Sequence, residues 1–98
     1  QAIPKKIIYN VRSKSIEIID LLRDAPELSL KKLFADSHSR SEVVATFLSI
    51  LEMCSVGGLL ITQTDDDYMI SLTGVHDAEH LLERLDARNA EENNDGNQ

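Results

Sequence analysis

The chain has 98 residues, of which 42% are apolar, and a formal net charge of −7 at pH 7. This length supports one small domain and is too short for a cleft between two lobes. We expect neither an enzyme nor a cofactor. The apolar runs fall far short of the about 20 residues that cross a bilayer, and no signal segment opens the chain, which favours a cytoplasmic protein without a membrane partner. The single cysteine, Cys54, excludes an internal disulfide and suits a buried helix position.

Charge is distributed unevenly along the chain. Residues 1–33 carry seven Lys or Arg against four Asp or Glu, whereas residues 34–98 carry three against thirteen. The carboxy-terminal two thirds should therefore repel phosphate. Because the first residue is Gln1 rather than Met, we expect the chain to be a segment of a longer protein.

The first helix is expected to follow an extended lead-in over residues 1–10. Asn10 is suited to capping, which places the helix start near Val11. The Ala25-Pro26 pair predicts its end near Asp24, because the residue before a proline is disfavoured in helical conformation. One face of this helix carries the residues expected to enter the core: Val11, Ser15, Ile18, Ile19 and Leu22.

Two further helices are expected after a short extended residue at Leu28. Ser29 is a plausible cap for a helix of about two turns over residues 30–35. Ser39 and Glu42 have capping-box spacing ahead of a long apolar run, which predicts a third helix over residues 40–56. Gly57-Gly58 ends that helix.

The sequence after the third helix predicts a β-hairpin, with strands over residues 59–63 and 68–72 and a polar tip over 64–67. Three helices and this hairpin predict a mainly helical α+β fold, a winged helix-turn-helix, over residues 11–74. Residues 75–88 have helical spacing of apolar residues, and we expect a short additional helix there. Residues 89–98 are expected to form a disordered acidic tail.

The third helix is more apolar than a small domain requires. On a helical wheel its apolar side chains span roughly 160°, where somewhat over 100° suffices for a helix that faces a core. Either another protein covers the excess, or the hairpin and the fourth helix do. The residues of this arc are Ile50, Val43, Cys54, Phe47, Leu51, Val44 and Leu48.

A winged helix usually reads DNA, so a DNA-binding transcription regulator is the alternative function. The chemistry of the third helix argues against it, because no Lys, Arg, Asn or Gln occurs between Ser41 and Val56. The hairpin tip, Asp65-Asp66-Asp67, would bring three negative charges to the phosphate backbone. A dimerisation domain that uses the fourth helix is a third hypothesis, weakened by the narrow apolar stripe of that helix.

The segment from His76 to His80 matches the H-x-x-E-H pattern of some zinc enzymes. A catalytic zinc site needs a third protein ligand and a shielded cleft, and only 18 residues follow His80. We therefore expect surface histidines and no metal site. His38 has no partner in the sequence that would support a catalytic triad.

The run from Arg40 to Met53, RSEVVATFLSILEM, resembles the third-helix signature of kleisin carboxy-terminal domains, above all those of segregation and condensation protein A. Residues 28–34 are similar to the second helix of that family, and Gln63 matches a glutamine of its first wing strand. The resemblance covers about residues 11–73. Asp67 and Met69 depart from the family pattern, with the wing aromatic shifted to Tyr68.

The resemblance implies a protein-binding domain that docks on the ATPase head of an SMC protein and helps to close a ring around DNA in chromosome segregation and condensation. It implies binding of segregation and condensation protein B to another part of the kleisin, only indirect contact with DNA, and association with the nucleoid. By position, the residues that would face the SMC head include Phe47 and Leu51. We add the neighbouring or matching positions Ile50, Arg40, Gln63 and Tyr68.

Overall fold

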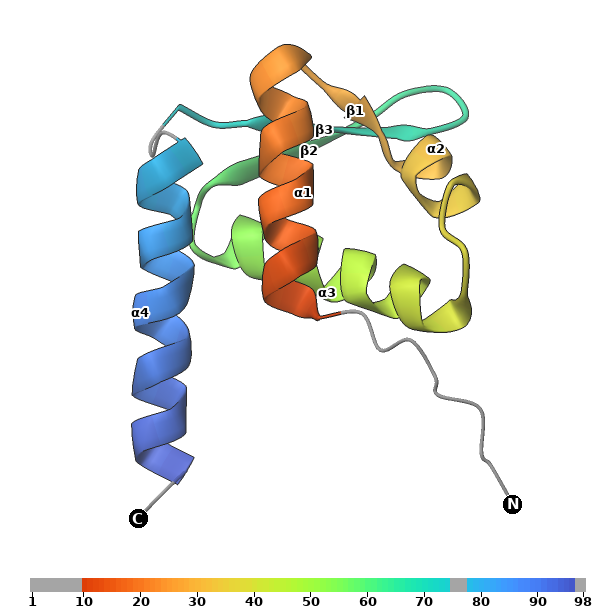
Figure 1. The fold of residues 1–98 in the computed structure, drawn as a ribbon. Coiled ribbons are helices and arrows are strands. Elements are labelled where there is room, and N and C mark those ends of the chain that lie inside the picture. Colours follow the sequence, from red (N-terminus) through yellow and green to blue (C-terminus); the bar gives the residue numbers. More distant parts are fainter. Residues whose placement is uncertain (1–9, 75–77, 97–98) are drawn as a thin grey trace, which may run out of the picture.

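The computed structural model describes residues 10–74 and 78–96, with the side chains of residues 79–91 in the second stretch. The chain order is α1 (Val11–Asp24), β1 (Leu28–Ser29), α2 (Leu30–Ala35), α3 (Arg40–Ser55), β2 (Leu59–Gln63), β3 (Tyr68–Leu72) and α4 (Ala78–Gly96). Figure 1 shows α1 crossing α3 and running beside α4, with the strands at the far end of α1. The fold is α+β and mainly helical, as the sequence predicts.

Local hydrogen bonds fix the helix boundaries close to their predicted positions. The Asn10 side chain accepts hydrogen bonds from the backbone of Arg12 and Ser13 at the start of α1. At the end of α3, Gly57 N–H donates to the Cys54 carbonyl and Gly58 N–H to the Met53 carbonyl. Gly57 has φ +80, so α3 ends in a Schellman motif.

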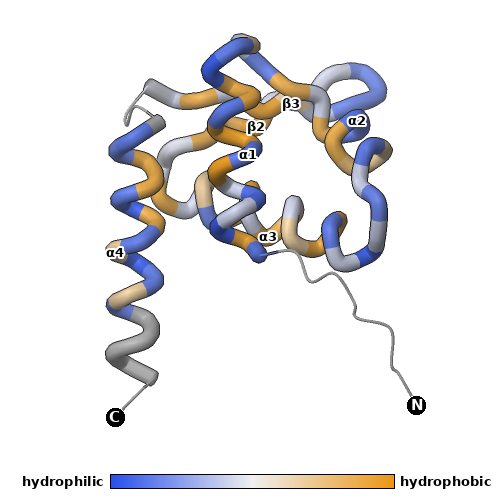
Figure 2. The backbone as a smooth tube through the Cα atoms, in the orientation of Figure 1, coloured by the Kyte–Doolittle hydropathy of each residue, from blue (hydrophilic) through white to orange (hydrophobic). Residues whose placement is uncertain are grey.

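The predicted hairpin of β2 and β3 is confirmed, and β1 joins it to give a three-stranded antiparallel sheet in the order β1-β3-β2. The sequence indicated only one extended residue at Leu28; the short strand forms because Leu28 lies opposite Ile70 of the central strand. Figure 2 shows apolar residues along β2 and β3 and a hydrophilic loop between them.

The core lies where α1, α3, α4 and the sheet meet. Gly58 packs so closely under α4 that a Cβ there would lie 2.3 Å from Leu81 Cδ1. The buried apolar side chains of this cluster are Ile18, Ile19, Leu22, Ile50, Met53, Leu59, Ile70, Leu81 and Leu85. Cys54 is partly buried against the cluster, in line with its expected packing role.

The last helix differs from the prediction. The sequence indicated a helix that ends at Arg88 and a disordered tail from Asn89, but α4 continues to Gly96. The apolar stripe stops near Leu85, and the remaining turns are polar. Apolar periodicity marks only the part of a helix that packs against the rest of the domain. The helix end predicted from it therefore came before the observed end. The lead-in over residues 1–9, the linker over 75–77, and residues 97–98 lie outside the described residues.

Candidate functional site

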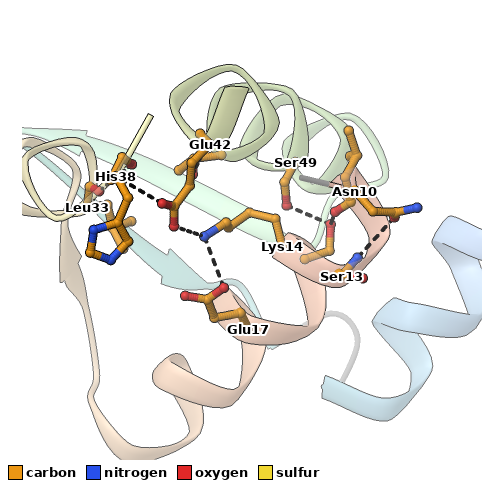
Figure 3. A network of polar contacts seen from close by, with 12 residues as sticks. Asn10, Ser13, Lys14, Glu17, Leu33, His38, Glu42 and Ser49 are labelled. Carbon is orange, nitrogen blue, oxygen red and sulfur yellow. Dashed lines mark hydrogen bonds and ion pairs between the residues drawn. The ribbon is translucent and has the colours of Figure 1, made fainter. Parts of the chain in front are cut away.

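The buried side of α3 carries polar side chains beside the apolar ones that enter the core. At its amino-terminal end Lys14 Nζ of α1 donates to Glu42 Oε2 at 2.6 Å and also lies 3.0 Å from Glu17 Oε2. Both Lys14 and Glu42 are buried. The network in Figure 3 thus joins the first turns of α1 and α3 and, through the His38 N–H that donates to Glu42, the loop between α2 and α3.

The predicted capping box forms only in part. Ser39 Oγ accepts from the Glu42 N–H as expected, but the Glu42 carboxylate accepts from His38 N–H and Lys14 instead of closing back on Ser39. The hydrogen bond from Lys14 and that from the His38 backbone lower the pKa of Glu42. Burial alone would lower the pKa of Lys14, yet its hydrogen bonds to Glu42 and Glu17 raise it.

Small polar side chains continue this inner face toward the middle of α3. Ser15 and Ser49 share a hydrogen bond of 2.6 Å between their hydroxyl oxygens, and both are buried. Thr46 donates to the Glu42 carbonyl one turn before it. A direct contact between two serine hydroxyls requires the backbones of α1 and α3 to approach closely.

The opposite face of α3 is apolar and exposed. Large side chains there keep between 36% and 50% of their surface accessible to solvent: Val43, Val44, Phe47, Leu48 and Leu51. Of the arc identified in the sequence, only Ile50 is buried and Cys54 partly buried. Over the described residues, the hairpin and α4 therefore leave most of the excess apolar surface of α3 uncovered.

The structure separates the predicted partner-binding residues into three groups. Phe47 and Leu51 are exposed on this outer apolar face, and Arg40 is exposed at its amino-terminal end. Ile50 is 2% accessible and belongs to the core, so its assignment as a partner-binding residue was wrong. The helical wheel placed Ile50 within the apolar arc of α3, but it could not show that this edge of the arc faces the core.

Gln63 and Tyr68 lie at the far end of the hairpin, directly opposite each other in the β2–β3 register. Paired residues of an antiparallel ladder share one side of a sheet, so Gln63 and Tyr68 lie on the same side as the pair of Ile61 with the buried Ile70, two residues along. Ile61 is 40% accessible. Ile61 was not identified from the sequence as an exposed apolar residue, because a strand residue opposite a core position is normally buried.

The acidic hairpin tip is tied to α2 through Asp67. Its carboxylate accepts from the Ser29 hydroxyl, from Lys31 N–H at 3.0 Å and from Tyr68 N–H at 2.7 Å. These hydrogen bonds, that from Ser29 foremost, lower the pKa of Asp67. Asp65 and Asp66 are exposed, and Lys31 Nζ lies 3.8 Å from Asp66 Oδ2, so one lysine faces three carboxylates. The tip therefore presents a negative surface, which does not suit contact with phosphates.

Metal-ligating side chains do not cluster in the part of the chain that the structure describes: no three of His, Cys, Asp and Glu are placed to share an ion. Of the H-x-x-E-H segment, His76 lies outside the described residues, and His80 is exposed on α4. Among the helices of residues 10–74 and 78–96, none combines the length and apolarity needed to span a membrane.

Protein-family models, curated proteins and solved structures were compared with the chain, and none matches it.

Proposed function

We propose that this chain is a winged-helix docking domain that binds the ATPase head of an SMC protein through the outer face of α3. The order of helix, short helix, long helix and β-hairpin supports the winged helix. The docking function rests on one observation: the outer face of α3 exposes several large apolar side chains to solvent, namely Val43, Val44, Phe47, Leu48 and Leu51. Monomeric proteins seldom expose contiguous apolar side chains of this size without a partner.

The resemblance of the third helix to kleisins gives this surface its proposed partner. As a kleisin subunit, the protein helps to close a ring around DNA, and it reaches the nucleoid through the ring rather than by contact with bases. Segregation and condensation protein B binds elsewhere on the kleisin. The outer face of α3 acts by burial of apolar surface, with Phe47 and Leu51 as its central anchors.

The same face weighs against a DNA-reading regulator. Base edges are read by hydrogen-bonding side chains, and the outer positions of α3 hold valine, phenylalanine and leucine. Arg40 is the only basic residue of the helix, and Asp65 and Asp66 stand at the hairpin tip. A gel shift at physiological salt that survives competitor DNA would favour the regulator instead.

The direct test is co-expression of the whole chain with an SMC ATPase head, followed by co-purification and calorimetry. Phe47→Arg and Leu51→Lys should each weaken binding about a hundredfold or more, because each places a charge in a desolvated contact. Leu21→Lys is the matched control, since Leu21 is 43% accessible on a different helix. It should bind as the wild type does.

Circular dichroism and thermal melts establish that each variant is folded before binding is scored. Both test residues are half exposed, so we expect native-like spectra. A folded Phe47→Arg protein that binds the head normally would remove the outer face of α3 from the interface. A wild-type chain that binds no SMC head would refute the kleisin proposal.

A further inference from the structure

The free edge of β2 is the second surface of interest in this fold. The strand order β1-β3-β2 leaves β2 paired on one side only within the described residues. The opposite edge of the sheet is protected by its shortness, because β1 is only Leu28–Ser29. β2 is longer, Leu59–Gln63, and contains no charged residue, proline or glycine.

The pairing pattern shows which backbone groups of β2 point outward. Thr73 N–H donates to the Gly58 carbonyl at one end of the hairpin, and Thr64 N–H donates to the Asp67 carbonyl at 2.8 Å at the other. Hydrogen-bonded pairs alternate along an antiparallel ladder, so Leu60 and Thr62 also bond to β3. The N–H and C=O groups of Ile61 and Gln63 therefore point away from β3, at the open edge.

The side chains beside these groups favour a strand partner. Leu60 and Ile61 are 55% and 40% accessible, and being consecutive they project from opposite faces of the sheet. An added strand would cover apolar surface on both faces while its backbone bonds to Ile61 and Gln63. Proteins usually block such edges with charges, proline or bulges, but β2 has no charged residue or proline and pairs with β3 in an unbroken register.

We propose that the β2 edge binds an extended segment of a partner protein, which adds as an antiparallel strand and carries basic residues at its amino-terminal end. The direction follows the sheet, in which both strand pairs are antiparallel, and the charge follows from the end of β2. The strand runs toward the exposed Asp65 and Asp66, so the amino-terminal end of an antiparallel occupant lies next to them. This site is separate from the outer face of α3 and does not depend on the identity of the partner that binds there.

A second copy of this chain fits the edge poorly. Its β2 has no Lys or Arg to place beside Asp65 and Asp66, and each copy carries a formal charge of −7. A basic strand instead gains attraction from that charge. Sedimentation equilibrium of the chain alone should therefore show a monomer, and a dimer abolished by Ile61→Pro would overturn the proposed occupant.

The experiment uses a synthetic, end-capped nonapeptide with two lysines followed by alternating valine and threonine, titrated into the full chain and followed by NMR. Binding should protect the amide hydrogens of Ile61 and Gln63 from solvent exchange. The amides of Leu60 and Thr62, already bonded to β3, should change little. A peptide with glutamates in place of the lysines should bind at least about tenfold more weakly, since it meets Asp65 and Asp66 with like charge.

Two modifications, one in the protein and one in the peptide, test whether binding depends on backbone hydrogen bonds at the β2 edge. Ile61→Pro removes an outward N–H without removing a bond to β3, so the fold should persist and peptide affinity should fall about tenfold or more. Methylation of alternate amide nitrogens in the peptide removes the same bonds and leaves the protein unchanged, which keeps the test valid if the proline variant unfolds. Two peptides are needed, one methylated at the odd and one at the even amide positions, and normal binding of both would overturn the proposal. Peptide binding that is lost in Phe47→Arg but kept in Ile61→Pro would also overturn it.

Discussion

The two faces of α3 depart from the usual arrangement of an amphipathic helix, because polar side chains share the buried side with Ile50 and Met53 and large apolar ones lie exposed. The inner face, against α1, buries Glu42, Thr46 and Ser49 in hydrogen bonds, whereas the outer face exposes Phe47 and Leu51. Polar groups are tolerated inside only because each finds a partner; no side-chain nitrogen or oxygen that is buried in the described residues lacks one. Apolar content alone therefore does not show which face of a helix enters a core.

If the inner face stabilises the fold, breaking its ion pair should have the largest effect. Lys14→Met leaves the Glu42 carboxylate buried without its cation, and we expect the free energy of unfolding to fall by about 3 kcal/mol. Urea denaturation at neutral pH measures this. The double variant Lys14→Met/Glu42→Gln should recover part of the loss, because the stranded charge is gone. A loss below about 0.5 kcal/mol in Lys14→Met would mean that the pair is solvated.

Acid should weaken the same pair more gradually. The pKa of Glu42 is lowered in the folded protein, so its contribution is present above the ordinary glutamate pKa and is lost as the pH falls through the folded value. Lys14, whose pKa is raised, stays charged throughout that range; its contribution is lost only as alkaline pH rises through its own folded pKa. The stability difference between wild type and Glu42→Gln should therefore shrink as the pH falls. Denaturation at a series of pH values checks this, and a constant difference would contradict it.

The serine contact should have a smaller effect. Ser49→Ala removes one partner of the buried hydroxyl pair, but Ser15 still donates to the Val11 carbonyl, so we expect a loss of about 1 kcal/mol. Ser13→Ala, at an exposed position of α1, serves as the control and should change the melting temperature little. Equal melting temperatures for the two variants would show that the Ser15–Ser49 contact adds no stability.

The outer face should matter least for folding. Val44→Ser and Leu48→Gln replace exposed apolar side chains, and each should change the free energy of unfolding by less than about 0.5 kcal/mol. Ile50→Ala on the same helix should cost about 3 kcal/mol, because it opens a cavity in the core. If Val44→Ser destabilised the protein as much as Ile50→Ala does, the outer face would belong to the core, and a docking role for it would lose its support.

Short-range signals in the sequence determine the local structure. Asn10, Ser29 and Ser39 cap helices because their side chains accept the free N–H groups of a first turn, and Pro26 and Gly57 mark the ends of α1 and α3. The bounds of the two hairpin strands, residues 59–63 and 68–72, also follow from the sequence pattern. These signals act over a few residues, so no knowledge of the tertiary structure is needed to read them.

The buried side of α1 followed from the sequence, but the buried sides of α3 and of the hairpin depend on tertiary packing. The apolar arc of α3 predicted excess apolar surface, but its position did not reveal that α1 would pack against the side of α3 that carries Glu42, Thr46 and Ser49. Lys14 contacts Glu42 and Ser15 contacts Ser49, and these partners are 28 and 34 positions apart in the sequence. The same holds for Ile50, turned into the core, and for Ile61, left open at the sheet edge. Burial depends on which distant segments pack together, and hydrogen bonds between them offset the desolvation of polar groups that periodicity assigns to the surface.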